Sequence, residues 1–302
     1  DFGKKNQPVQ NYLRGIDLST SRGFVEYTQG DVRFNREYFC SYPDKLMALH
    51  FTADQKGKIS FSLSHLLVYQ PEKVTEGKDE LIFNGIIQGN GLGYTIRMKV
   101  LHQGGSIKMG HQQITVEGAD EATVFYTVDT EYSPVYPLYK GEKPRQTTEK
   151  IIKSAITKGY ETVKHTHISD YQTLYNRVKF TLSGDTASEK LPTDIRVKQL
   201  QQGFTDDASL KVLWFNLSRY LLINASRPGT LPSNLQGVWN TFEKAPWNGN
   251  FQSNINLQEM YWGCGPTQLP ECEEAYLEWI EGLVEPGRKT AGEYYGTKGW
   301  VS

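Results

Sequence analysis

The sequence has few cysteines, little excess charge of either sign and no long apolar run. Its 302 residues contain only Cys40, Cys264 and Cys272, which is too few for a disulfide framework, and their spacing fits no zinc site. The 33 basic and 34 acidic residues nearly cancel, which argues against a nucleic-acid partner. No apolar run approaches the ~18 residues that span a bilayer. We therefore expect neither nucleic acid nor membrane as a partner.

The cysteines allow two interpretations. Cys264 and Cys272 could pair in an oxidising compartment, but three buried free thiols are the expected state. The first residues are polar and lack the apolar core of a signal peptide, so we expect that such a peptide has been removed or that the sequence begins internally.

Histidine is absent from the chain after residue 167, because all six histidines precede residue 168. With no histidine and no serine in a nucleophile elbow there, an acyl-transfer triad is not expected. His165, His167 and Asp170 lie within six residues, but one helix supplies too few ligands, so we expect no metal. No glycine-rich phosphate loop is present, and no cofactor is expected.

Residues 1–135 have the pattern of an antiparallel β-sandwich. Short strand-like runs recur about every ten residues, with turn residues between them and no helical period. The runs are 23–28, 32–41, 45–53, 58–67, 80–88, 92–101, 106–109, 112–117 and 122–129.

Residues 136–302 are predicted to be mainly helical. In the linker, residues 136–185, we expect helices at 148–158 and 160–175 and a short strand at 178–182. Beyond it we expect a helix capped by Thr193 or Asp194, a clear helix at 206–225, and a helical pair at 271–282 and 283–295. Long polar and aromatic loops between the helices indicate a helical toroid with its site at one mouth.

The stretch 226–262 has an unusual composition. Its 37 residues hold three of the six tryptophans, six asparagines and three glutamines, but only four charged residues. Aromatic faces beside neutral amides suit a ligand with apolar faces and hydroxylated edges, as a sugar has. A long loop held by its own amides and tryptophans is the equally weighted structural alternative.

The acidic and amide side chains of this stretch are its candidate catalytic residues. Glycoside hydrolysis normally needs two carboxylates, and only Glu243 and Glu259 are present here. Either could be a general acid, although a surface role is expected for both. Asn254 and Asn256 would face the same side of an extended segment and could hold one water or one hydroxyl.

The motifs SRPGTLPSNLQGVWN, APWNGNF, NINLQ and YW, followed by ECEEAYLEWIEGLVEPGRKTAGEYYGTKGWV, resemble glycoside hydrolase family 95. This family comprises inverting, exo-acting α-L-fucosidases and α-L-galactosidases. The earlier runs RGIDLSTSRGFVEY, REYFCSYPDKLMALHFTA and HISDYQTLYNRV resemble its β-domain and linker. The resemblance spans essentially the whole chain.

The resemblance implies an N-terminal β-sandwich at 1–135 lacking its first strands, a helical linker at 136–185, and the first helices of an (α/α)6 barrel at 186–302. In the family, two asparagines hold the attacking water, an aspartate activates it and a glutamate is the general acid. The asparagines match Asn254 and Asn256, whereas both acidic residues are expected beyond Ser302. This segment alone is therefore expected to be inactive.

The expected substrate is an oligosaccharide or polysaccharide with terminal L-fucose or L-galactose. Trp239, Trp247 and Gln252 are expected to line the sugar site, and Gln252 stands where family fucosidases often have histidine. L-fucosidase, L-galactosidase and a non-catalytic carbohydrate-binding protein or fragment remain the alternatives. A periplasmic or secreted location is expected, as for other glycan-degrading enzymes.

Overall fold

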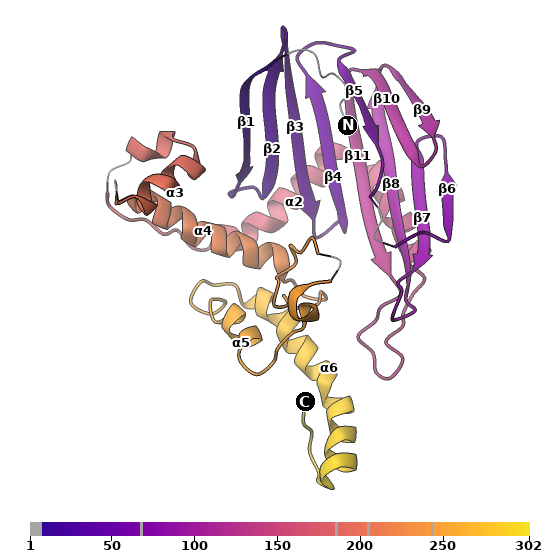
Figure 1. Ribbon diagram of the computed structural model, residues 1–302, viewed down its shortest axis with the longest axis vertical. Helices are drawn as coiled ribbons and strands as arrows, with labels where there is room; N and C mark the ends of the chain where they lie inside the picture. The colour runs from indigo at the N-terminus through magenta and orange to yellow at the C-terminus, as the bar shows by residue number, and fades with distance from the viewer. Residues whose placement is uncertain (1–7, 67–68, 185–186, 204–205, 243) are drawn as a thin grey trace. The chain divides into compact units, whose positions relative to one another are not determined.

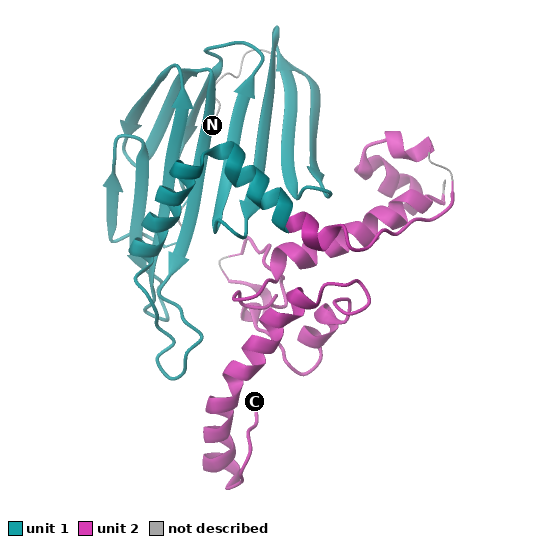
Figure 2. Cartoon of the chain, turned by 180° about the vertical axis from the view of Figure 1, so that it is seen from behind, with its two compact units in different colours: residues 1–170 teal, residues 171–302 magenta. Residues whose placement is uncertain are grey.

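The computed structural model describes residues 8–66, 69–184, 187–203, 206–242 and 244–302. The chain divides into two compact units, Asp1–Asp170 and Tyr171–Ser302, coloured separately in Figure 2. The division lies inside the segment predicted as the linker, and each unit is described by itself below.

The first unit contains two antiparallel sheets (Figure 1). The larger sheet has the order β1-β2-β3-β4-β11-β8-β7-β6, and the smaller has the order β5-β10-β9. The strands are β1 (Val9–Asp17), β2 (Arg22–Gln29), β3 (Val32–Ser41), β4 (Leu46–Ala53), β5 (Ile59–Leu63), β6 (Lys73–Glu76), β7 (Glu80–Ile86), β8 (Gly93–Gln103), β9 (Ser106–Gly110), β10 (Gln113–Ala119) and β11 (Glu121–Thr130).

The two sheets enclose the main core of the first unit. Phe83 and Val124 of the large sheet and Ile114 and Val116 of the small one are almost completely buried in a single cluster. Because successive side chains of a strand point to opposite faces, this cluster takes every second residue and leaves the alternate residues for the other face. The predicted sandwich is therefore present.

Two helices cover the other face of the large sheet (Figure 2). Helix α1 (Pro144–Lys158) and the part of α2 (Tyr160–Tyr175) that belongs to this unit pack Ile152 and Val163 against Phe39 and Phe125. Both helices were predicted from their spacing. α1 begins with proline, whose fixed φ suits a first turn, and ends at Gly159 in a positive-φ conformation.

A largely buried carboxylate holds α2 to the sheet. Glu37 of β3 bonds to the Tyr160 hydroxyl and pairs with Arg22, and the Lys164 ammonium lies 2.7 Å from its Oε2. Burial opposes ionisation of Glu37, but the hydrogen bonds from Lys164 and Tyr160 outweigh it and lower the pKa of this carboxyl. His167 approaches the carbonyls of Thr20 and Ser21 at 3.1 Å.

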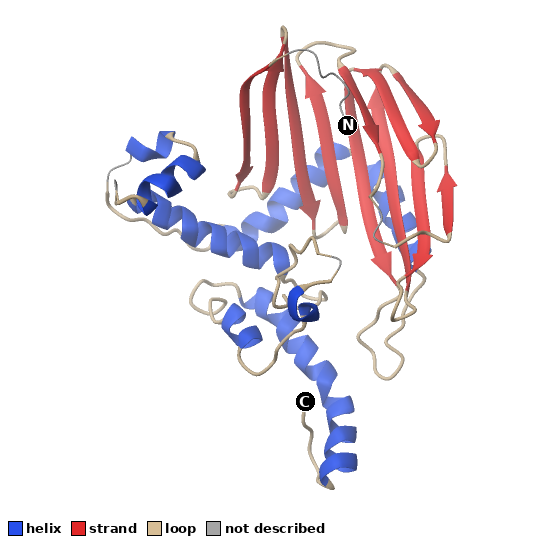
Figure 3. Cartoon of the chain, viewed as in Figure 1, coloured by secondary structure: helices blue, strands red, loops and turns tan. Residues whose placement is uncertain are grey.

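The second unit is helical (Figure 3). Its helices are α3 (Thr193–Gln201), α4 (Ala208–Ala225), α5 (Asn256–Tyr261) and α6 (Pro270–Tyr295), with two short 3-10 turns, η1 (Ala187–Lys190) and η2 (Pro246–Gly249). A core cluster joins the end of α2 to α4, α5 and α6 through Leu174, Ile223, Leu257 and Cys272.

Two buried arginines link α4 to neighbouring segments. The Asp207 side chain caps the helix by accepting from Leu210 N at 2.9 Å, and it binds Arg196 through both oxygens at 2.8 and 2.9 Å. Further along the helix, Arg219 donates to the carbonyls of Leu174 and Tyr175. These bonds satisfy carbonyls at the C-terminus of α2 that have no partner within the helix.

Three expectations for the second unit are wrong. Residues 178–182 form no strand; the Phe180 ring instead packs against Phe215 of α4 at 4.9 Å between ring centroids, tilted by 48°. The N-cap of α3 is Pro192, without a side-chain hydrogen bond, so neither Thr193 nor Asp194 caps it. The pair predicted at 271–295 is the single helix α6, which continues through Pro286.

Helix α6 continues through Pro286, although proline lacks an N–H and its ring crowds the carbonyl of Gly282, four residues earlier. The helix ends at Gly296 in the left-handed conformation. Among the residues that the structure describes, no helix combines the length and the apolar character needed to cross a membrane.

Candidate functional site

The stretch 226–262 follows α4 and is mostly irregular, and η2 and the short α5 are the only helical turns among its described residues. Irregular backbone needs hydrogen-bond partners from side chains or from other loop segments. The bonds that hold this stretch therefore determine where its candidate residues lie.

Tyr261, the last residue of α5, is the central anchor of the stretch. Its side chain is buried, and its hydroxyl accepts from Ser233 N at 2.9 Å and lies 2.8 Å from Ser226 Oγ. Ser226 Oγ donates to the carbonyl of Cys272 at 2.7 Å, so the remaining bond is donated by Tyr261 to Ser226. Burial raises the pKa of Tyr261 and keeps the hydroxyl neutral. The Tyr261 phenol thus links α5 to the start of the stretch, and the Ser226 hydroxyl links that start to α6.

A second set of bonds ties the middle of the stretch together. Leu235 N donates to Asn250 O at 3.2 Å, and Gln236 Nε2 donates to Pro246 O at 3.3 Å. Asn234 Oδ1 accepts from Gln236 N at 2.8 Å and closes a tight turn. The segments 234–237 and 246–250 are therefore neighbours, which places η2 beside the turn.

Three non-glycine residues of the stretch have left-handed backbone. The φ angles are 49° at Trp247, 57° at Asn248 and 42° at Gln252. Such conformations cost on the order of 1 kcal/mol or more each and concentrate at ligand-binding and active sites. Two of these residues, Trp247 and Gln252, were selected from composition and from the family resemblance. The backbone strain is an independent reason to consider this segment functional.

The two candidate asparagines lie at the start of α5. Asn254 is in the turn before the helix and Asn256 is its first residue, and both are exposed. The expectation that this segment is extended is wrong, because Leu257 N bonds back to Gln252 O and Glu259 N to Ile255 O. The helix begins too early for strand alternation to apply.

The aromatic candidates are open to solvent. Trp239 is 52% exposed and Trp247 is 74% exposed, whereas Gln252 is half-buried. Within the described part of the chain, no hydrogen bond or ring contact joins these three residues to one another or to Asn254 and Asn256.

Tyr261 was not selected from the sequence, although the motif containing it was. Leu257 and Tyr261 are four residues apart and both are buried, so they form the inward face of α5. That spacing is the signal that could have identified Tyr261 as an anchor.

Carboxylates are scarce in this stretch. Glu259 is exposed, and Glu243 lies outside the described residues. Glu278 of α6 reaches the loop and accepts from Gly229 N at 3.1 Å. No group of three or more histidine, cysteine or acidic side chains in the described chain is arranged to hold a metal.

The cysteines differ in burial. Cys264 and Cys272 are free and buried, as expected, and burial raises the pKa of Cys264 to about 12 and that of Cys272 to about 11. Both thiols are therefore protonated near neutral pH. Cys40 is exposed on β3, so the expectation of three buried thiols is wrong for that residue.

Comparison with known proteins finds a family match for each half of the chain. Residues 159–302 match the Glycosyl hydrolase family 95 catalytic domain, and residues 2–134 match the Glycosyl hydrolase family 65, N-terminal domain. Alpha-L-fucosidase 2 of Arabidopsis thaliana is 31% identical over 100% of this chain, and probable alpha-fucosidase A of Aspergillus niger is 30% identical over 100%. The chain spans only 39% and 40% of these two relatives.

A solved structure titled putative kojibiose phosphorylase from human microbiome is similar in fold. Its TM-score is 0.57 at 12% identity, covering 95% of this chain and 38% of that one. The likeness confirms the predicted fold class, an antiparallel β-sandwich followed by helices of an (α/α)6 barrel.

Proposed function

We propose that the chain, whose residues 159–302 match the Glycosyl hydrolase family 95 catalytic domain, is part of an exo-acting glycosidase that removes terminal α-L-fucosyl residues from glycans. The observation that carries the proposal is the similarity along the whole chain to proteins named as α-fucosidases. The expected partner is an oligosaccharide or polysaccharide that ends in L-fucose.

We propose hydrolysis with inversion, in which water attacks the anomeric carbon from the face opposite the leaving oxygen. Asn254 and Asn256 hold this water through their amide oxygens. An amide is a poor base, so a carboxylate must accept the proton while a carboxylic acid protonates the leaving oxygen. Both acidic groups are proposed to come from residues outside these 302.

The anchoring of α5 supports the role of Asn256. A group that positions water must be held close to its productive place, because a displacement of about 1 Å can cost roughly 100-fold in rate. Tyr261 secures the helix that begins at Asn256 to Ser226 and Ser233. Trp239 and Trp247 are proposed to pack against the C–H faces of the sugar.

An α-L-galactosidase is the second candidate, and Gln252 is the residue that favours it. L-galactose carries a hydroxyl on C6 that L-fucose lacks, and a site that hydrogen-bonds this hydroxyl discriminates strongly. Gln252 offers an amide donor and acceptor where family fucosidases often have histidine. We further propose an extracytoplasmic location, because glycan substrates occur there.

The test uses the full-length protein with aryl α-L-fucoside and aryl α-L-galactoside. Asn256→Ala is expected to reduce kcat by roughly 100-fold or more, whereas Asn176→Ala, an exposed asparagine near the end of α2, should leave it unchanged. The preferred glycoside identifies the sugar. Wild-type turnover by a folded Asn256→Ala variant would remove the proposed water site, and saturable sugar binding without hydrolysis would favour the non-catalytic alternative.

A further inference from the structure

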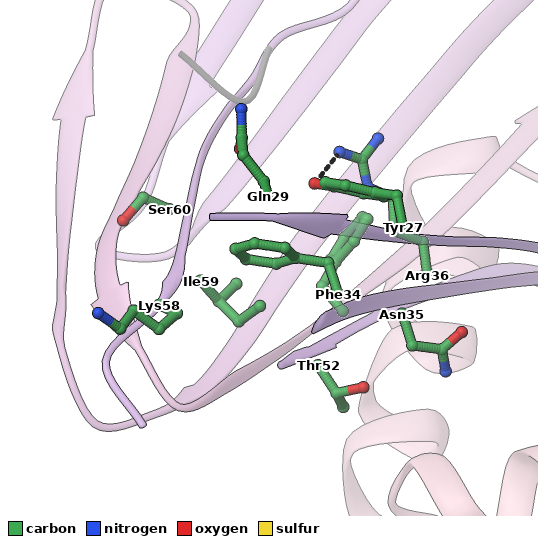
Figure 4. A pocket seen from close by; sticks show the side chains of 10 residues that line it. Tyr27, Gln29, Phe34, Asn35, Arg36, Thr52, Lys58, Ile59 and Ser60 are labelled. Carbon is green, nitrogen blue, oxygen red and sulfur yellow. Dashed lines mark hydrogen bonds between the residues drawn. The ribbon is translucent and has the colours of Figure 1, made fainter. Parts of the chain in front are cut away.

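Figure 4 shows a hollow of the first unit beside Phe34 and Ile59. It has room for about one water molecule, and the Phe34 ring that lines it already stacks on Tyr27 at 5.1 Å between centroids. Arg36 donates to the Tyr27 hydroxyl at 2.7 Å, the bond drawn as a dashed line in that view. These contacts pack the sandwich. The feature that bears on function lies instead in the second unit, in the turn before α5.

The turn formed by residues 252–255 carries Asn254 and leads into α5. Its first residue, Gln252, has a left-handed backbone with a φ of 42°. A backbone bond from Leu257 N to Gln252 O closes the turn at 3.3 Å. That bond leaves the carbonyl of Ser253, inside the turn, to find a partner elsewhere.

Gln258, in the first turn of α5, is this partner, because its side-chain nitrogen donates to the Ser253 carbonyl. A carbonyl can only accept, so the nitrogen of the Gln258 amide, and not its oxygen, must face it. Since a peptide group is planar, holding this carbonyl oxygen also holds the Cα of the next residue, Asn254. Within the described chain, it is the one side-chain hydrogen bond that reaches this turn from the helix.

The oxygen of the Gln258 amide contributes nothing to the stability of the fold. Gln258 Oε1 is buried and accepts no hydrogen bond within the described chain. A buried acceptor without a donor is unfavourable and offsets the bond that the nitrogen makes. Ser253 is exposed, so water can replace the amide at its carbonyl without joining the turn to α5. The bond from Gln258 therefore acts on the geometry of the turn more than on folding.

We propose that Gln258 is a positioning residue for the hydrolysis, which holds the Ser253 carbonyl and thereby sets the place of the Asn254 amide. The inference rests on the proposed role of Asn254 in holding the attacking water. Tyr261 secures α5 three residues further on, so Gln258 connects the turn to a fixed helix. Loss of this bond displaces the water-holding amide and lowers kcat, whereas the binding of the sugar, and with it KM, stays nearly the same.

The experiment measures kcat and KM of the full-length protein on the aryl α-L-glycoside that the wild type prefers. Gln258→Met removes the amide but keeps the length of the side chain and its helix propensity. Gln258→Glu keeps the shape, but its carboxyl group can donate to Ser253 only when it is protonated. Gln201→Glu, at an exposed position of α3, controls for the added charge. Thermal unfolding checks that each variant is folded.

Gln258→Met is expected to lower kcat roughly tenfold or more at every pH, with KM and the thermal midpoint close to those of the wild type. Gln258→Glu should show a similar loss at neutral pH. Its kcat relative to the wild type should recover as the solution is acidified, because the pKa of glutamate is about 4.3 in water and burial raises it. Gln201→Glu should change neither kcat nor KM.

Asn254→Ala, measured in the same assay, separates this inference from the proposed function. A wild-type kcat in Gln258→Met beside an inactive Asn254→Ala would overturn the role of Gln258 alone. A loss in Gln258→Glu that does not change with pH would also overturn it, because the bond to Ser253 would then not be what matters. Full turnover by Asn254→Ala would overturn the proposed water site and the role of Gln258 together.

Discussion

Replacement of Tyr261 by phenylalanine tests how the Trp-rich stretch is held. The substitution keeps the buried ring but removes the oxygen that accepts from Ser233 N and donates to Ser226 Oγ. Ser226 keeps its bond to the Cys272 carbonyl, but the buried Ser233 N–H loses its acceptor. An unsatisfied buried group costs about 1–3 kcal/mol, so we expect the free energy of unfolding to fall by about 2 kcal/mol.

Tyr276→Phe is the matched control, measured with Tyr261→Phe by denaturant unfolding. The Tyr276 ring stacks on Tyr261 at 5.1 Å, but no hydrogen bond of its hydroxyl occurs within the described chain. The control should therefore change stability by less than about 0.5 kcal/mol. Equal stability of the two variants would refute the anchoring role. In the full-length enzyme, Tyr261→Phe should lower kcat as well, because α5 carries Asn256.

Two further predictions concern buried charges. The hydrogen bonds from Arg196 hold the pKa of Asp207 well below its usual range despite burial, so its stabilising effect is complete above the unfolded pKa of about 4 and is lost as the pH falls toward the folded value. Asp207→Asn should lower the free energy of unfolding by about 3 kcal/mol at pH 7. Unfolding curves in acid should show this difference from the wild type shrinking between pH 4 and pH 2. A difference that does not change with pH would contradict the stabilising role of the ionised Asp207. Glu37→Gln should destabilise the first unit by about 3 kcal/mol in thermal or denaturant unfolding, because Arg22 and Lys164 lose their counter-charge. The same change at the exposed Glu161 should be nearly neutral, and comparable losses at both sites would show that the Glu37 contacts contribute little.

The β-sandwich was largely predictable because turn-forming residues separate most of its strands. Strands β2 to β5 and β7 to β11 fall where the turn residues bound them. Strand β1 was missed because its outward and inward residues are both largely exposed, which leaves no alternation to detect. Strand β6 has only four residues, too few for a pattern.

In the helical half, the presence of the helices was predictable but their boundaries were not. The boundary predicted between residues 282 and 283 is absent, because α6 continues through it, and residues 178–182 form no strand. The candidate site, too, was predictable only in part. Composition identified the Trp-rich stretch, but the role of Tyr261 depends on Ser226, Ser233 and Cys272, which are distant in sequence and adjacent only after folding.

The configuration of the sugar released by the full-length protein tests the proposed function most directly. Proton NMR recorded during the first minutes of aryl α-L-fucoside hydrolysis distinguishes the anomers before they equilibrate. A single attack by water held at Asn254 and Asn256 predicts that β-L-fucose appears first. Initial release of α-L-fucose would require a covalent intermediate on a protein nucleophile and would contradict the proposed mechanism.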